Sequence, residues 1–182
     1  MKNNLENSYK KKLNHITTFI LDIDGVLTDG KVYIHDDGNL LRAMHTKDGF
    51  AIKTAIKKGY RVAIISGAKD TNVIKRLKYL MIEDVFIQVD DKLPVFYKYL
   101  KDKGLNAKEV MYMGDDIPDL PLLKRVGLSA APKDAVQEVL DMVDYISHKK
   151  GGNTCVRDII EQVLRVQGNW TFEPDQNDTA AN

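Results

Sequence analysis

Cysteine, net charge and long hydrophobic runs are all scarce in this sequence of 182 residues. The single cysteine, Cys155, excludes an internal disulfide. Lysine and arginine total 27 against 26 for aspartate and glutamate, so the net charge of +1 gives no general attraction to nucleic acid or to a membrane surface. Apolar runs such as residues 62–66 (VAIIS) are far shorter than the ~20 residues of a membrane-spanning helix. Because no signal-like run follows Met1, we expect a soluble, cytoplasmic protein with no nucleic acid or membrane partner.

The sequence does contain a regular alternation of short β-branched runs and segments with helical spacing. Its length suits one domain, which we place at residues 15–167, between polar end segments 1–14 and 168–182 that we expect to be mobile. The alternation predicts an α/β fold with a parallel sheet covered on both faces. The predicted strands are Thr18 to Leu21, Arg61 to Ile65, Val85 to Ile87, Val110 to Met113, Leu128 to Ala130 and Tyr145 to Ile146.

One segment interrupts the alternation. Residues 31–47 (KVYIHDDGNLLRAMHTK) predict two short strands around a DDGN turn, and therefore a β-hairpin between the first strand and the first helix. An exposed two-stranded ribbon is rarely stable alone, so we expect this hairpin to contact another subunit.

Polar side chains follow most of the predicted strands. The carboxyl ends of parallel strands meet at one edge of an open sheet, where ligands bind. In an extended segment Asp22 and Asp24 face the same way, and Gly25 allows a sharp turn after them. Carboxylates gathered in this way repel one another unless a cation lies between them. The residues that we expect to converge are Asp22, Asp24, Ser66, Gly67, Lys92, Gly114, Asp115, Asp116 and Asp119.

The composition of this set favours Mg²⁺ and phosphate. Oxygen ligands without a nearby histidine or cysteine select a hard cation, and the four histidines lack the paired spacing of a zinc site. Lys92 and the Ser66 hydroxyl are suited to bind phosphate oxygens. Each piece alone has a common structural explanation: DGVLTDG as a turn, GDDIPD as a helix start, a lone lysine as a surface charge. Their joint occurrence at successive strand ends favours a phosphate site.

These residues resemble the motifs of the haloacid dehalogenase superfamily. The first motif matches Asp22-Ile23-Asp24-Gly25 with Thr28, the second Ser66, the third Lys92 and the fourth Gly114 to Asp119. The resemblance implies a Rossmann-like three-layer αβα sandwich and phosphoryl transfer through an aspartyl phosphate. It assigns Asp22 as the nucleophile and Asp24 as the general acid and base.

The same resemblance assigns the remaining positions. Mg²⁺ would be held by the Asp22 carboxylate, the Asp24 backbone carbonyl and Asp115. Ser66 and Lys92 would hold the transferring phosphoryl oxygens, while Asp116 and Asp119 would orient waters or Lys92.

The spacing of the motifs leaves no room for a cap domain. Only 41 residues separate Asp24 from Ser66, and 25 separate Ser66 from Lys92. A monomer would therefore have an open site, and neighbouring subunits would have to help exclude water. This pattern, with HTKDGFAIK (45–53), MGDDIPDLPLLKRVGLS (113–129) and GGNTCVRDII (151–160), resembles the capless, tetrameric phosphatases of 3-deoxy-D-manno-octulosonate (Kdo) 8-phosphate, a precursor in lipopolysaccharide synthesis.

Membership in that family would imply a homotetramer with hairpins and C-terminal tails at subunit interfaces. In that family the tail after Gly152 reaches a neighbouring subunit's site, so Arg157 is a candidate contact for the leaving group. Arg157 has an equally good explanation as a surface cation on an amphipathic helix. Ala68 differs from the arginine that many members have there. The substrate contacts implied are Asp24, His45, Thr46, Lys47, Asp48, Gly49, Gly67, Arg76, Lys92 and Arg157.

Two alternatives remain open at the level of the sequence. A phosphatase of a nonulosonate 9-phosphate or another sugar phosphate would use the same motifs. A receiver domain also gathers acids, a lysine and Mg²⁺ at a sheet edge, with phospho-aspartate as a switch. Receivers phosphorylate an aspartate after the third strand, however, and have no use for a general acid such as Asp24.

Overall fold

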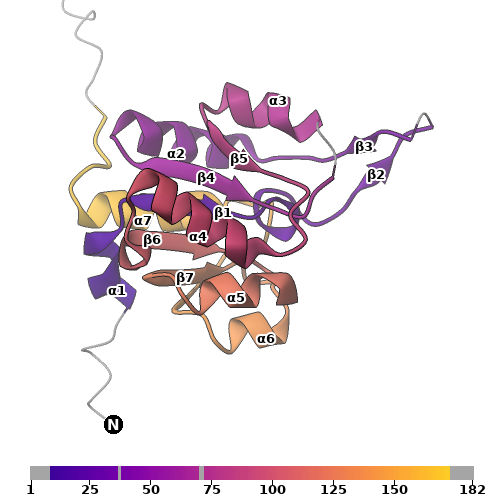
Figure 1. Cartoon of the computed structure of the whole chain (residues 1–182). Coiled ribbons are helices and arrows are strands. Elements are labelled where there is room, and N and C mark those ends of the chain that lie inside the picture. The colour runs from indigo at the N-terminus through magenta and orange to yellow at the C-terminus, as the bar shows by residue number, and fades with distance from the viewer. Residues whose placement is uncertain (1–8, 37, 70–71, 173–182) are drawn as a thin grey trace, which may run out of the picture.

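Six short strands form one parallel sheet in the order β5-β4-β1-β6-β7-β8, with β1 between β4 and β6 (Figure 1). The computed structural model describes residues 9–36, 38–69 and 72–172. The strands are β1 (Thr18–Leu21), β4 (Arg61–Ile65), β5 (Asp84–Phe86), β6 (Val110–Met113), β7 (Leu128–Ala131) and β8 (Tyr145–Ile146). The predicted α/β class is confirmed, and the strand bounds agree with the prediction to within one residue.

The sheet is apolar on both faces, which explains why helices cover both. In β1, Phe19 and Leu21 belong to one buried cluster and Ile20 to the other, because successive side chains of a strand point to opposite faces. On the first face pack α2 (Thr46–Lys57), α3 (Asn72–Tyr79) and α7 (Cys155–Val166). On the second pack α4 (Lys92–Lys103), α5 (Leu120–Leu123) and α6 (Gln137–Leu140). The result is a three-layer αβα sandwich.

Helix α4 begins where the sequence supplies a cap. The Asp91 carboxylate accepts the backbone N–H of Leu93 at 3.1 Å, and the helix ends at Gly104 in the left-handed conformation. This start makes Lys92 the first residue of the helix and directs it to the carboxyl edge of the sheet, as its contacts below show.

The hairpin exists but is shorter than the sequence predicts. Its strands are only β2 (Tyr33–Ile34) and β3 (Leu40–Leu41), and it projects from the same side of the molecule as the carboxyl ends of the sheet strands (Figure 1). The expected span of 31–47 was wrong at its end, because Thr46 and Lys47 already belong to α2. His45 Nδ1 accepts the N–H of Lys47 at 3.1 Å and so caps this helix.

Structure begins earlier and ends later than the expected domain limits of 15 and 167. Residues from the predicted mobile ends form α1 (Tyr9–Lys12), bury Leu13 in the core and pack Trp170 edge-on against Phe50. These apolar residues have mostly polar neighbours in the sequence, so the composition of the end segments does not reveal that they pack against the domain. Nowhere in the described residues does a helix have the length and apolar character needed to span a membrane.

Candidate active site

The turn after β1 places two acidic side chains at the carboxyl edge of the sheet. Asp22 follows β1 directly, and its backbone N–H donates to the carbonyl of Met113 in β6 at 3.1 Å. The chain then turns at Gly25, where φ is +80°. A Cβ built on Gly25 would lie 1.9 Å from Asp115 Oδ2, so only glycine allows both this turn and the approach of Asp115.

A single open cavity of about 440 Å³ unites most of the predicted site residues. It lies beyond the ends of β1, β4 and β6, where a parallel sheet binds its ligands. Its walls include Asp22, Asp24, Gly25, Ser66, Gly67, Lys92, Asp115, Asp116 and Asp119. The motifs that are spread over nearly 100 residues of sequence therefore meet in one place.

Lys92 lies buried between two carboxylates. Its Nζ is 3.1 Å from Asp22 Oδ1 and 2.6 Å from Asp119 Oδ1. Burial alone would lower the pKa of Lys92, but the two carboxylates outweigh it and the net pKa is raised, so the ammonium stays charged. Burial raises the pKa of Asp22, against the opposing effect of Lys92 and a hydrogen bond from Ser66.

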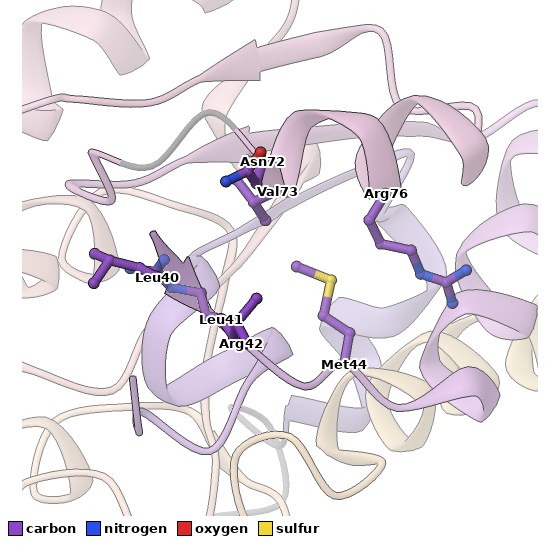
Figure 2. A pocket seen from close by; sticks show the side chains of 7 residues that line it. All are labelled: Leu40, Leu41, Arg42, Met44, Asn72, Val73 and Arg76. Atoms are coloured by element: carbon purple, nitrogen blue, oxygen red, sulfur yellow. The ribbon is translucent and has the colours of Figure 1, made fainter. Parts of the chain in front are cut away.

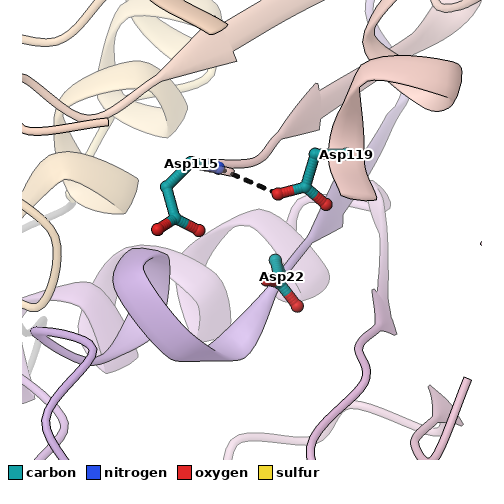
Figure 3. A group of neighbouring side chains, drawn as sticks. All are labelled: Asp22, Asp115 and Asp119. Atoms are coloured by element: carbon teal, nitrogen blue, oxygen red, sulfur yellow. Dashed lines mark hydrogen bonds between the residues drawn. The ribbon is translucent and has the colours of Figure 1, made fainter. Parts of the chain in front are cut away.

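Three carboxylates converge within metal-binding distance. One oxygen each from Asp22, Asp115 and Asp119 lies within 4.8 Å of the others (Figure 3). Asp119 already accepts hydrogen bonds from Lys92, the Tyr112 hydroxyl and the backbone N–H of Asp115, the last at 2.9 Å. Asp119 is thus saturated, and Asp22 and Asp115 are the carboxylates with capacity for a cation.

The remaining two carboxylates fit a divalent cation. Burial, together with the negative charges of Asp22 and Asp119, raises the pKa of Asp115 to about 8. Asp22 Oδ1 is buried and has an ion-pair partner in Lys92 but no well-directed hydrogen bond. An all-oxygen site with this much uncompensated charge suits a hard ion such as Mg²⁺.

Tyr112 belongs to this network, although no sequence pattern predicted it. The side chain is fully buried in β6, and its hydroxyl donates to Asp119 Oδ1 and lies 3.4 Å from Lys92 Nζ. Burial and the nearby Asp119 raise the pKa of Tyr112 well above its usual value, so the phenol remains a donor. In the sequence it is indistinguishable from the other apolar residues of its strand.

We expect Tyr112→Phe to lower kcat about tenfold, because Asp119 loses a donor and holds Lys92 less firmly, a difference of ~1.4 kcal/mol in the transition state. Steady-state kinetics would measure it. Tyr99→Phe is a matched control, since the Tyr99 hydroxyl also donates to a carboxylate, Asp84 at 2.9 Å, but away from the cavity. Equal kcat values for both variants would show that Tyr112 has only a structural role.

A second glycine-rich segment supports the turn after β1 from behind. The N–H of Gly152 donates to the carbonyl of Val26 at 2.9 Å, and Cys155 Sγ contacts the same carbonyl at 3.2 Å. A Cβ on Gly151 would lie 1.9 Å from the Gly25 carbonyl oxygen. Only glycine at 151 therefore allows the two loops to approach this closely.

Gly151→Ala should displace the turn at Gly25 and lower kcat by about tenfold or more, because small misplacements of reacting groups are costly. Stopped assays of phosphate release would show it. Gly59→Ala strains a positive φ of +90° but has no heavy atom within 4 Å of its added Cβ. That control should lose stability and keep its kcat; an unchanged kcat in Gly151→Ala would argue against tight support of the turn.

Of the predicted substrate contacts, Asp24, Gly67 and Lys92 line this cavity, and the other seven do not. His45, Thr46 and Lys47 start α2, and Gly49 packs beside Arg76, whose Nη2 would be 3.0 Å from an added Cβ. Asp48 is buried, with Oδ1 and Oδ2 accepting the backbone N–H groups of Arg157 and Thr154 at 2.7 and 3.3 Å. In this chain Asp48 therefore joins the starts of α2 and α7.

Arg76 and Arg157 line two other cavities. Arg76 lines one of about 290 Å³ between the hairpin and α3. Arg157 lines another along α7, where its Nε donates to Glu161 at 3.1 Å and its guanidinium lies 5.6 Å from the centre of the Trp170 ring. Within one chain Arg157 is thus held by its own helix and by Trp170.

Comparison with known proteins agrees with this geometry. A family model described as haloacid dehalogenase-like hydrolase matches residues 84–156. The chain is 36% identical over 157 residues to the 3-deoxy-D-manno-octulosonate 8-phosphate phosphatase of Salmonella typhi, which covers 86% of this chain and 84% of that protein. The chain belongs to the haloacid dehalogenase superfamily. Within the superfamily it is a small, capless phosphatase, so the enzyme interpretation is confirmed over the receiver-type switch.

Solved structures of superfamily members match the fold closely. The Moraxella catarrhalis 3-deoxy-D-manno-octulosonate 8-phosphate phosphatase in complex with magnesium, phosphate and KDO superposes with a TM-score of 0.86 at 32% identity, covering 88% of this chain and 92% of that chain. The cobalt-bound phosphatase of Haemophilus influenzae gives 0.85 at 32% identity, covering 92% and 98%. Divalent metals are therefore bound by relatives of this fold, in accordance with the carboxylate cluster here.

Proposed function

We propose that this phosphatase hydrolyses Kdo 8-phosphate to Kdo and inorganic phosphate, a step in lipopolysaccharide precursor synthesis, through a phosphorylated Asp22. The observation that supports this most is the buried Lys92–Asp22 ion pair in a cavity that also contains Asp24 and Asp115. A nucleophile, a fixed cation and a second carboxyl group are what the two-step transfer of a phosphoryl group needs.

The first step forms a bond between an Asp22 oxygen and phosphorus. The bond from phosphorus to the sugar oxygen breaks, and Asp24 gives that oxygen a proton. In the second step Asp24 takes a proton from water, the resulting oxygen attacks the same phosphorus, and Asp22 is released. Lys92 and Ser66 hold the phosphoryl oxygens in both steps, while Asp119 keeps Lys92 in place.

The Asp22 and Asp115 carboxylates, with the backbone carbonyl of Asp24, would hold Mg²⁺. The ion supplies positive charge that reduces the repulsion between an anionic nucleophile and an anionic substrate. Ser66, Gly67 and Lys92, which line the same cavity, bind and orient the phosphoryl group.

We also propose that the chain acts as a homotetramer with the hairpin at an interface. Val32, Tyr33, Ile34 and Leu41 expose apolar side chains, with Ile34 79% exposed. A cluster of this kind on a two-stranded ribbon is typical of a contact surface. Measurement of the molar mass in solution by light scattering tests the assembly, and a monomeric mass at assay concentration would refute it.

A panel of phosphate esters tests the substrate. We expect kcat/KM for Kdo 8-phosphate to exceed the values for Kdn 9-phosphate and for simple hexose phosphates at least tenfold, a difference of ~1.4 kcal/mol in transition-state binding. A higher value for Kdn 9-phosphate would reassign the enzyme to that nonulosonate. Equal values for all esters would leave a general phosphatase.

A further inference from the structure

A buried arginine from the hairpin segment engages the carboxyl group of Asp24. Arg42 follows β3 directly, and its side chain is 7% exposed. Its Nε donates to Asp24 Oδ1 at 2.7 Å and its Nη2 to Oδ2 at 3.1 Å. The Thr28 hydroxyl also donates to Oδ1, at 3.3 Å. Both oxygens of Asp24 are therefore engaged, in the two-pronged geometry that guanidinium and carboxylate groups favour.

Arg42 lies at the boundary between two cavities. Asp24 lines the cavity that contains Asp22 and Lys92, whereas Arg42 lines the neighbouring cavity of about 290 Å³. Figure 2 shows Val73 at the start of α3 with Met44 opposite it, and the Arg76 side chain descending from the same helix with its guanidinium turned away from Leu41. Of the described residues around it, Arg42 and Arg76 are cationic and none is acidic. The neighbouring cavity is thus suited to an anionic group joined to a phosphate in the first.

The contact restricts what Asp24 can do. A carboxyl group whose two oxygens both face a guanidinium cannot at the same time point an oxygen at the leaving group of a phosphate ester. The Arg42 side chain is buried, so loss of its partner Asp24 would leave a buried charge without compensation. A second anion can replace Asp24 without that cost, whereas water cannot. The resting geometry therefore favours release of Asp24 only when such an anion is present.

We propose that Arg42 is a positioning residue that holds Asp24 until the carboxylate of the substrate's leaving group takes its place. This inference rests on the proposed function, because it requires a phosphate ester that also has a carboxylate. Binding of that carboxylate to Arg42 frees Asp24 to turn toward the oxygen that leaves phosphorus. A neutral sugar phosphate fills the phosphate site but leaves Asp24 engaged, so Arg42 makes turnover depend on the second charge of the substrate.

Arg42→Gln separates this role from a structural one, because it should act in opposite directions on two substrates. For Kdo 8-phosphate we expect kcat/KM to fall about tenfold, since the carboxylate loses its partner. For glucose 6-phosphate, which has no carboxylate, we expect kcat to rise about threefold, since Asp24 is no longer held. Arg42→Lys keeps the charge but not the fork, and we expect it to retain most of the preference for the carboxylated ester.

Lys31→Gln is the matched control. It removes the same charge from the hairpin segment, at a side chain 75% exposed, and should change neither substrate. A fall by the same factor on both substrates in Arg42→Gln would overturn the inference. If the unsubstituted enzyme shows no preference for Kdo 8-phosphate, the proposed function fails. The kcat of Arg42→Gln for glucose 6-phosphate then tests the inference alone. A raised kcat supports the hold of Arg42 on Asp24, and an unchanged or lowered kcat refutes it.

Discussion

Asp22→Asn is expected to abolish both phosphate release and covalent labelling of the protein. The amide cannot attack phosphorus, so the loss in kcat should be on the order of 10⁴-fold or more, as for other enzymes that lose their nucleophile. Acid quenching during turnover of a ³²P-labelled ester should trap label on the unsubstituted protein and none on the variant. The amide is close in size to the carboxylate, so the fold should persist.

Asp29→Asn is a control on the same loop. Asp29 is exposed, accepts the N–H of Lys31 at 3.0 Å and does not line the cavity. Its amide variant should label and turn over normally. Normal phosphate release by Asp22→Asn would contradict the whole mechanism, because both of its steps pass through a bond between Asp22 and phosphorus.

Removal of divalent cations by EDTA is expected to abolish activity and to make stability depend on pH. In the metal-free protein the pKa of Asp115 rises from 3.8 to about 8, and that of Asp22 is raised too. The folded state then binds protons more tightly than the unfolded chain, so the free energy of unfolding falls as pH rises from about 4 to about 8. Mg²⁺ favours the ionised carboxylates and should reverse this trend.

Thermal unfolding at pH 5.5 and pH 8 measures the effect. We expect the metal-free Tm to be lower at pH 8, and Mg²⁺ to raise the Tm most at pH 8. Asp115→Asn should reduce both responses, whereas Asp102→Asn, at an exposed position on α4, should keep them. Full activity after exhaustive chelation, or a Tm without any response to Mg²⁺, would argue against the proposed cation site.

Much of the fold could be predicted because periodicity is a local signal. The run from Thr18 to Leu21 combines β-branched and large apolar residues, and the structure buries all four of them. The hairpin end was predicted less well, since His45 caps α2 through a local hydrogen bond that apolar patterning does not reveal. The burial of Leu13 was missed for a related reason, because a single apolar residue in a polar segment shows no periodicity, and its burial depends on the surface that it packs against.

Part of the site could likewise be predicted from the sequence, and the residues that were missed were missed for a similar reason. Asp22, Lys92 and Asp115 could be assigned from their places at successive strand ends, because parallel strands bring those ends together whatever lies between them. Tyr112 and Arg42 could not. Tyr112 looks like any apolar strand residue and Arg42 like any cation of an exposed hairpin, and only their contacts with Asp119 and Asp24 give them a role.

The sequence by itself determined the class of fold, the carboxylates, the lysine and the absence of room for a cap, since each depends on residue type and spacing along the chain. The tertiary structure alone decided that the hydrogen-bonding capacity of Asp119 is used within the protein, whereas Asp22 and Asp115 have oxygens that could bind a cation. It also showed that Arg42 holds Asp24 and that Gly151 supports the turn at Gly25. Arg42 and Asp24 are 18 residues apart and Gly151 and Gly25 are 126 apart, so the geometry of these two contacts depends on how the layers pack rather than on any local pattern.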